Sequence, residues 1–146
     1  MTVRQDNDAL SAGLHSVALH LLRRARQDDA SFGLSAARLS ALSVLVFGGP
    51  QRLTRLAELE QVRPPTMSRM VQAMQNDGLV AVRTAHGDAR AREIRVTRKG
   101  RRLLERARDA RIGHLATLLD GATPNETRKI AEALVVLKAL LAEAKG

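Results

Sequence analysis

The chain has 146 residues, of which 45% are hydrophobic, and it contains no cysteine. This length can build one compact core but hardly two, so we expect a single domain over residues 1–146. The absence of cysteine excludes a disulfide framework, a thiolate zinc site, a nucleophilic cysteine and redox sensing through thiols. Acidic residues stand where a secretory signal would place its apolar core, and no apolar run approaches the length of a membrane span. We therefore expect a cytoplasmic protein.

Positive charge is concentrated in one segment of the chain. The formal net charge is +9, and residues 83–102 carry eight cations against two acids, a local excess of six. A concentrated excess of this kind points to a polyanionic partner.

Apolar residues at helical spacing predict four helices in the first half of the chain. The first helix covers about residues 8–28, and Ser35 can cap a second, strongly hydrophobic helix that stops at Gly48 and Gly49. Thr54 can cap a short third helix to about residue 60. A fourth helix begins at residues 64–65, both proline, and ends near residue 78.

The second half of the chain predicts a hairpin followed by two long helices. Residues 79–84 and 92–97 alternate apolar with polar side chains around a turn at residues 85–91, which indicates a two-stranded β-hairpin. Thr97 is a good N-cap for a helix to about residue 120. Thr123, Pro124 and Glu126 combine a capping box with an early proline and start the last helix. The fold class is therefore mostly α with a small β-hairpin wing.

Two short helices, a tight turn and a charged hairpin predict a winged helix-turn-helix lobe over residues 53–100. On residues 64–77, the apolar side chains of Met67, Met70, Val71 and Met74 share one face of the helix. The residues on the outward face are candidates for DNA recognition: Pro65, Thr66, Ser68, Arg69 and Gln72.

The outward side chains have the chemistry that DNA recognition needs. Thr66 and Ser68 lie in the first helical turn and can donate hydrogen bonds to phosphate oxygens. Arg69 can fork onto guanine, and Gln72 can pair with adenine through two hydrogen bonds. The alternative interpretation is an ordinary surface face whose methionines fill gaps in the core.

The cations of the hairpin and its surroundings are the second set of candidate DNA contacts. Asp88 can pair with Arg90 or Arg92 and hold one guanidinium in place, and an arginine at a narrow hairpin tip can enter the minor groove. A solvated, disordered loop is the alternative. The candidate wing residues are Arg83, Asp88, Arg90 and Arg92, and the additional candidate phosphate contacts are Arg63 and Arg95.

Apolar stripes on the terminal helices indicate a homodimer. These helices fall in residues 8–47 and 101–146, outside the lobe, and so small a monomer would struggle to cover all the stripes. Packing of the stripes within one chain is the alternative. The candidate dimer-interface residues are Leu10, Leu14, Val17, Leu118, Leu134, Leu137 and Leu141.

Two motifs resemble those of the MarR family, the multiple antibiotic resistance regulators. The first motif resembles the family's wing signature and reads Asp88-x-Arg90, five further residues and then Val96-Thr97-x-x-Gly100, with valine where leucine is usual. The second motif, residues 53–69, resembles the family's recognition element but lacks the glycine that is usual in its turn. The resemblance implies a homodimer with a triangular outline on a pseudo-palindromic operator. It also implies that Asp88 buttresses the wing and that Arg90 enters the minor groove.

Neither catalysis nor a metal site is expected. His15 and His20 are five residues apart, which places them about 140° apart around a helix and unsuited to share a metal ion. His20 is also a candidate to line a ligand pocket, although a histidine that is hydrogen-bonded within the protein or solvated is the simpler interpretation. No catalytic triad pattern or phosphate-binding glycine loop occurs, so we predict neither a cofactor nor enzymatic activity.

The leading functional hypothesis is a homodimeric, sequence-specific regulator of transcription that binds double-stranded DNA. It would act as a repressor and be released by a small ligand of unknown identity. The alternative is a basic protein that coats the nucleoid or RNA without sequence preference. Phe32 and Phe47 are the only aromatic residues and neither lies in the cationic segment, which disfavours binding by base stacking.

Overall fold

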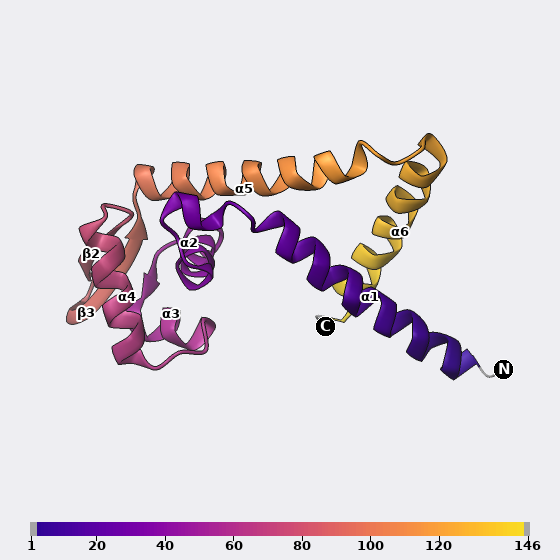
Figure 1. Ribbon diagram of the computed structural model, residues 1–146. Helices are drawn as coiled ribbons and strands as arrows, with labels where there is room; N and C mark the ends of the chain where they lie inside the picture. Colours follow the sequence, from indigo (N-terminus) through magenta and orange to yellow (C-terminus); the bar gives the residue numbers. More distant parts are fainter. Residues whose placement is uncertain (1–2, 145–146) are drawn as a thin grey trace. The chain divides into compact units, whose positions relative to one another are not determined.

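The computed structural model describes the backbone of residues 3–144 and, apart from residues 3–5, 85 and 89, their side chains (Figure 1). Contacts divide the described chain into two compact units. Residues 26–111 form one unit, which we call the winged lobe, and the described residues before 26 and after 111 form the other, the terminal unit.

The winged lobe contains helices that surround a small antiparallel sheet. Its elements are η1 (Asp29–Phe32), α2 (Ala36–Gly48), β1 (Gln51–Arg52), α3 (Leu53–Leu59), α4 (Pro64–Asn76), β2 (Val80–Ala85), β3 (Asp88–Val96) and the first part of α5 (Arg98–Leu119). The strand order is β1-β3-β2, with antiparallel pairing throughout. The sheet thus has a third strand, β1, which the sequence analysis did not expect. The winged helix-turn-helix fold class itself is confirmed.

One core holds the helices and the sheet of the lobe together. Large side chains from every layer are almost fully buried, namely Leu42 and Leu45 of α2, Leu56 of α3, Met67 and Met74 of α4, and Ile94 of β3. Helix α2 therefore packs with the winged elements, although the sequence grouping placed it with the terminal helices. The assignment of dimerisation to the terminal helices stays a prediction.

Two of the predicted helix caps agree with the structure, whereas α1 and α3 begin elsewhere than predicted; α1 covers Val3–Ala25 instead of residues 8–28. The hydroxyl of Ser35 accepts a hydrogen bond from the Arg38 N–H at 3.2 Å, and Thr97 accepts one from the Gly100 N–H at 3.1 Å, so both predicted caps are confirmed. The prediction that Thr54 caps α3 is wrong. Arg52 is the N-cap residue, without a side-chain bond, because β1 runs directly into the helix and places Thr54 inside it.

The turn between α3 and α4 has an unusual backbone conformation at Gln61. This residue has a φ of 54°, in the left-handed region that favours glycine. The Val62 N–H donates to the Ala57 carbonyl at 3.0 Å and closes the turn. The glycine that the sequence lacks at this turn is therefore replaced by a residue that adopts the same conformation.

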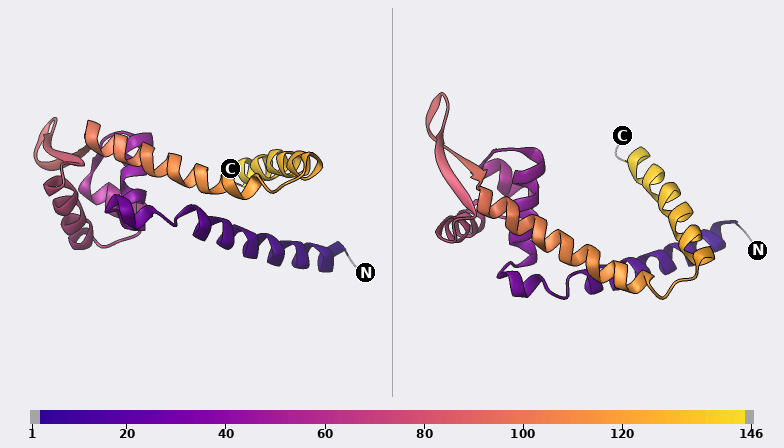
Figure 2. Two further views of the ribbon diagram at one scale, coloured as in Figure 1. Left: turned by 45° about the horizontal axis from the view of Figure 1, so that its top comes forward. Right: turned by 90° about the horizontal axis from the view of Figure 1, so that it is seen from above.

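The loop that connects the two strands of the hairpin is shorter than expected, and β3 contains a bulge. Strands β2 and β3 reach Ala85 and Asp88, so only two residues separate them instead of a loop over residues 85–91. Thr84 pairs with Arg92 and Ala85 pairs with Asp88, so β3 has three more residues than β2 between these pairs. The hairpin projects from the helices of the lobe in the right-hand view of Figure 2.

Close packing fixes the root of the hairpin to α5. The Thr97 hydroxyl donates to the carbonyl oxygens of Gly78 at 2.6 Å and Leu79 at 3.0 Å. A Cβ atom on Gly100 would overlap the Leu79 carbonyl oxygen. Position 100 of the Val96-Thr97-x-x-Gly100 motif therefore requires glycine for steric reasons.

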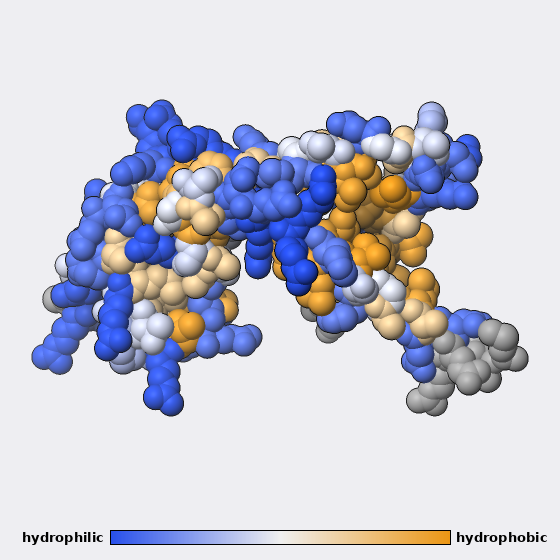
Figure 3. Space-filling model, viewed as in Figure 1, coloured by the Kyte–Doolittle hydropathy of each residue, from blue (hydrophilic) through white to orange (hydrophobic). Residues whose placement is uncertain are grey.

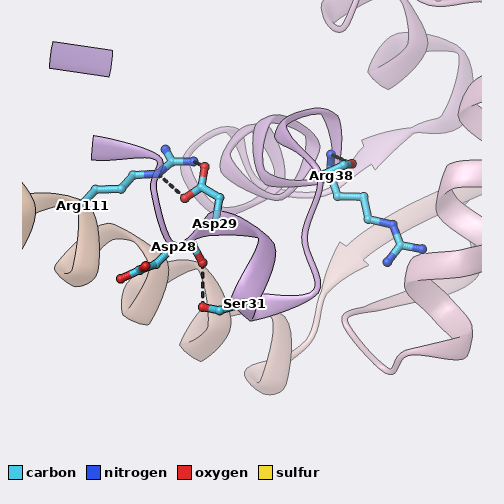
Figure 4. A network of polar contacts seen from close by, with 6 residues as sticks. Asp28, Asp29, Ser31, Arg38 and Arg111 are labelled. Carbon is cyan, nitrogen blue, oxygen red and sulfur yellow. Dashed lines mark hydrogen bonds and ion pairs between the residues drawn. The ribbon is translucent and has the colours of Figure 1, made fainter. Parts of the chain in front are cut away.

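A bidentate ion pair ties η1 to α5 within the lobe. Asp29 is the one buried charged side chain among the described residues, and it is 9% exposed. Arg111 donates from Nε and Nη2 to its two carboxylate oxygens, at 2.9 Å and 2.6 Å (Figure 4). In the same turn the Ser31 hydroxyl donates to the Asp28 carbonyl at 2.7 Å. The pair fixes the chain just before α2.

The terminal unit contains α1 (Val3–Ala25), the end of α5 and α6 (Pro124–Glu143). The predicted capping box of α6 is confirmed, because Thr123 accepts from the Glu126 N–H while the Glu126 carboxylate accepts from the Thr123 N–H. These hydrogen bonds from Thr123 lower the pKa of Glu126 below its ordinary value. Among the described residues of α6, none is buried.

Candidate nucleic-acid interface

The outward face of α4 is open to solvent. Met67, Val71 and Met74 are buried, whereas all five side chains predicted to face outward are exposed. The buried and exposed faces of α4 in the structure are thus the ones that the sequence predicted. Gln72 donates from Nε2 to Asn76 Oδ1 at 3.1 Å, which gives its amide a defined orientation before any ligand binds.

The wing arginines do not all lie on one face of the sheet. Arg92 is opposite Thr84 and two residues from the buried Ile94, so it shares the face of Ile94. Together with Ser68 and Gln72 of α4, Arg92 lines a small cavity at the base of the hairpin. Arg92 therefore lies beside the outward face of α4.

Arg83 and Arg95 lie on the opposite face of the hairpin from Arg92. Arg83 is directly opposite Glu93 in the register, and Glu93 binds the Arg95 guanidinium at 2.6 Å. The sequence analysis grouped Arg83 with Arg90 and Arg92, but the structure separates Arg83 from Arg92. It also gives Arg95, a candidate phosphate contact, an intramolecular carboxylate partner.

Asp88 makes a different contact from the one that we predicted. Its carboxylate accepts a hydrogen bond from the backbone N–H of Arg90 at 3.0 Å. Within the part of the chain that the structure describes, Asp88 makes no ion pair with either Arg90 or Arg92, so the prediction of a held guanidinium is wrong. A carboxylate two residues before an N–H forms an Asx turn, a local contact that competes well with a flexible side chain.

Two cations of the basic segment, Arg95 and Lys99, are already engaged. Lys99 Nζ donates to the Asp77 carbonyl oxygen at 2.7 Å, and the Asp77 carboxylate pairs with Arg38 at 2.9 Å. By contrast, the guanidinium groups of Arg69, Arg90 and Arg92 make no ion pair or hydrogen bond to the described residues. These three uncompensated charges are available to an external anion.

The lobe also has two surface cavities that sequence reasoning missed. The first, which we call the wing cleft, has a volume of about 260 Å³ and is lined by Arg52, Leu53, Thr54, Arg90, Ala91 and Arg92. The second, between α2 and α5, has a volume of about 530 Å³ and is lined by apolar side chains together with Ser43, Arg101, Glu105, Arg108 and Arg111. No local sequence pattern indicates either cavity, because the residues that line each one are far apart in the chain.

The described residues contain no candidate membrane span and no candidate metal cluster. None of their helices is both long and apolar enough to cross a bilayer. Side chains of histidine, aspartate and glutamate do not form a group of three or more that could hold a metal ion there.

Comparison with known proteins identifies the family. The sequence profile of the MarR family matches residues 34–91, which run from α2 into β3. The uncharacterized HTH-type transcriptional regulator Mb0904 of Mycobacterium bovis is 32% identical over 139 residues, covering 94% of this chain and 97% of that protein. The chain belongs to the MarR family.

Solved structures show the same fold as this MarR-family chain. The transcriptional regulator Tm0710 from Thermotoga maritima superposes with a TM-score of 0.83 at 23% identity, covering 94% of this chain and 96% of that one. A mutant of MepR from S. aureus, bound to an oligodeoxyribonucleotide, superposes with a TM-score of 0.73 at 17% identity, over 90% and 97% of the two chains.

Proposed function

We propose that this MarR-family protein is a sequence-specific transcriptional regulator. It binds double-stranded DNA as a homodimer on a pseudo-palindromic operator and acts as a repressor. One observation carries the proposal: α4 presents a polar, exposed face whose phase is fixed by buried methionines, and Arg92 of the wing lies beside it. The oligodeoxyribonucleotide bound to the MepR mutant, a protein of the same fold, supports this choice of partner.

The outward face of α4 reads the major groove. Thr66, in the first turn, donates to a phosphate oxygen where the helix dipole also favours an anion, and Ser68, at the start of the second turn, donates to a phosphate oxygen as well. Arg69 forks onto guanine, and Gln72 pairs with adenine. The bond from Gln72 to Asn76 occupies one amide hydrogen and leaves the other hydrogen and the oxygen for the base. Pro65 and Arg63 complete the contacts at the start of the helix.

The wing contacts the adjacent backbone and minor groove. Arg90 lies closer along β3 to the two-residue tip than Arg92, and its guanidinium makes no ion pair with the described residues, so we assign it to the minor groove. Arg92 lies at the base of the hairpin next to α4, which suits a phosphate between the two grooves. Asp88 supports this role by shaping the backbone at Arg90.

The terminal unit forms the homodimer. Its exposed apolar side chains include Leu10 at 71%, Val135 at 70% and Leu141 at 65%, and part of this surface is orange in Figure 3. An apolar groove of about 640 Å³ runs among α1, the end of α5 and α6. So much exposed apolar surface on one unit is typical of an interface. A second copy of the chain would bury it symmetrically.

A small effector acts through the cavity between α2 and α5. Its volume of about 530 Å³ suits a small molecule, and its lining of apolar side chains with Arg101 and Arg108 suits an amphipathic anion. A ligand that binds the DNA-free conformation more tightly than the DNA-bound one would lower operator occupancy.

The competing function is non-specific coating of nucleic acid, and the positions of the phenylalanines disfavour it. Phe32 lies under the Arg106 guanidinium at 5.9 Å, and Phe47 lines the cavity between α2 and α5. Neither ring offers a stacking platform on α4 or the wing.

Competition binding separates the two functions. At one fixed salt concentration, a regulator should prefer its selected operator over random duplex by at least ~10³-fold, whereas a coating protein should show almost no preference. A ratio near one for every fragment recovered from a genomic selection would contradict the proposal.

A further inference from the structure

Three arginines from separate parts of the lobe converge on the wing cleft. Arg52 comes from β1, whereas Arg90 and Arg92 come from β3, about forty residues later. Thr54 adds a hydroxyl from the first turn of α3, and no acidic residue lines the cleft. The cleft is therefore a cationic hollow with one neutral hydrogen-bond donor.

The backbone explains why the arginines meet there. Strand β1 pairs only Gln51 and Arg52 with β3, so the edge of β3 before Glu93 has no partner strand on that side within the described chain. The bulge of β3 falls in this same stretch, between Asp88 and Arg92. Bulges bend a strand and re-aim its side chains, and an unpaired edge leaves backbone polar groups open to a ligand.

The acids of the wing do not neutralise the cleft. Glu93, directly opposite Arg52 in the register, is bound by Arg95, and Asp88 is engaged by the backbone of Arg90. The guanidinium of Arg52 makes no ion pair or hydrogen bond with the described residues, and the Thr54 hydroxyl makes no hydrogen bond with them either. Clustered like charge without a counter-ion destabilises the fold unless an anion relieves it.

A phosphodiester group would supply the negative charge and the hydrogen-bond acceptors that the cleft lacks. Guanidinium forks match phosphate oxygens, and a threonine hydroxyl can donate to a third oxygen. Arg92 lines both the wing cleft and the cavity beside Ser68 and Gln72. The cleft thus adjoins the surface of α4 that faces DNA in the proposed function.

We propose that the wing cleft binds one phosphate of the DNA backbone in each half-site through Arg52 and Arg92, with Arg90 free to reach the adjacent minor groove, and that Arg52 is a DNA-contacting residue. This inference rests on the proposed function. It adds β1 to α4 and the wing as a third element of the interface, and the contact is independent of base sequence.

The salt dependence of binding tests the cleft first. Loss of one phosphate contact in each half-site of the dimer should flatten the plot of log affinity against log salt by about 0.9 per lost contact. Arg52→Ala should show that change and bind the operator at least about tenfold more weakly, and Arg52→Lys should restore most of the slope. Arg106→Ala removes the same charge from α5, beyond the cleft, and should leave the slope unchanged. Thermal unfolding of each variant checks that the lobe is folded.

A scan of operators that carry one neutral methylphosphonate at a time then locates the phosphate. One position in each half-site should weaken binding of the unaltered protein more than that of Arg52→Ala, because the variant has already lost one guanidinium contact to that phosphate. Equal weakening of both proteins at every position, or equal salt slopes for the Arg52→Ala and Arg106→Ala variants, would overturn the inference. Inorganic phosphate that perturbs the Arg52 NMR signal without coupling to any DNA phosphate would identify a free-anion site and also overturn it.

The outcome is separable from that of the proposed function. A failure to prefer any operator over random duplex would contradict the regulator proposal alone. The salt slopes of the Arg52 variants can still be compared on random duplex, because a phosphate contact does not depend on sequence.

Discussion

The winged lobe and the terminal unit place their apolar side chains in opposite ways. In the lobe, Leu42, Leu56, Met67, Met74 and Ile94 are almost fully buried, and uncompensated cations remain on the surface. In the terminal unit, α6 buries none of its described residues and long apolar side chains stay exposed. The lobe therefore has a buried core of its own, although Phe47 stays exposed, whereas the terminal unit leaves open the apolar surface that the proposed homodimer would bury.

The largest expected effect, on dimerisation and operator affinity, comes from placing a charge in the apolar surface of the terminal unit. Leu134→Asp puts a charge on an apolar side chain that is 48% exposed in the monomer, so the fold should survive while the dimer dissociates. Operator affinity should fall by about 10²-fold or more, since the two half-sites are no longer bound together. Sedimentation and operator binding measure both changes, and Leu134→Met should alter neither. A Leu134→Asp dimer of unchanged affinity would refute the assignment of this surface.

The next largest effect should come from the root of the wing. Gly100→Ala places a methyl group against the Leu79 carbonyl and should destabilise the protein by about 3 kcal/mol or more. Gly113, in the same helix, has no neighbour within 4 Å of an added Cβ atom. Gly113→Ala should therefore stabilise by up to about 1 kcal/mol. Denaturant unfolding at one protein concentration measures both variants, and similar values for the two would contradict the close approach.

Base reading by α4 should give a smaller and more selective effect. Arg69→Ala should relax preference at one operator position in each half-site by roughly 1–3 kcal/mol. Arg63→Ala, a candidate phosphate contact, should instead weaken binding to all sequences alike. Affinities for single-base operator variants distinguish the two patterns. A uniform loss for Arg69→Ala would reassign Arg69 to the backbone.

The smallest effect is expected at the wing tip. Arg90→Ala should weaken binding by about a few-fold on A·T-rich flanks, where the minor groove is narrow and strongly negative, and less on G·C-rich flanks. Titrations with operators that differ only in their flanks measure this difference. Equal losses on both kinds of flank would argue against insertion into the groove.

Local sequence signals predicted the recognition helix and most helix starts. The spacing of Met67, Val71 and Met74 sets the exposed face of α4, and Thr123 with Glu126 marks the start of α6, because each pattern lies within two helical turns. Strand β1 escaped prediction because two residues carry no periodicity. Because that strand runs directly into α3, the N-cap residue of α3 is Arg52 and the Thr54 cap prediction is wrong.

Contacts between distant residues had no signal in the sequence. Asp29 and Arg111 are 82 residues apart, so only the folded lobe brings their charges together. Arg52 meets the β3 arginines through a bulge that alternation of side chains cannot indicate. The charge pattern of the sequence placed Asp88 in the hairpin, but its backbone partner depended on the tight turn that the structure shows.

The spacing of half-sites tests most directly how the two regions act together. Genomic duplex fragments that bind the full chain can be selected, sequenced and footprinted. If the terminal unit pairs two lobes, each site should contain an inverted repeat whose half-site centres lie roughly 34 Å, about one helical turn, apart. Enrichment of single asymmetric sites, or no enrichment of any sequence, would contradict this account.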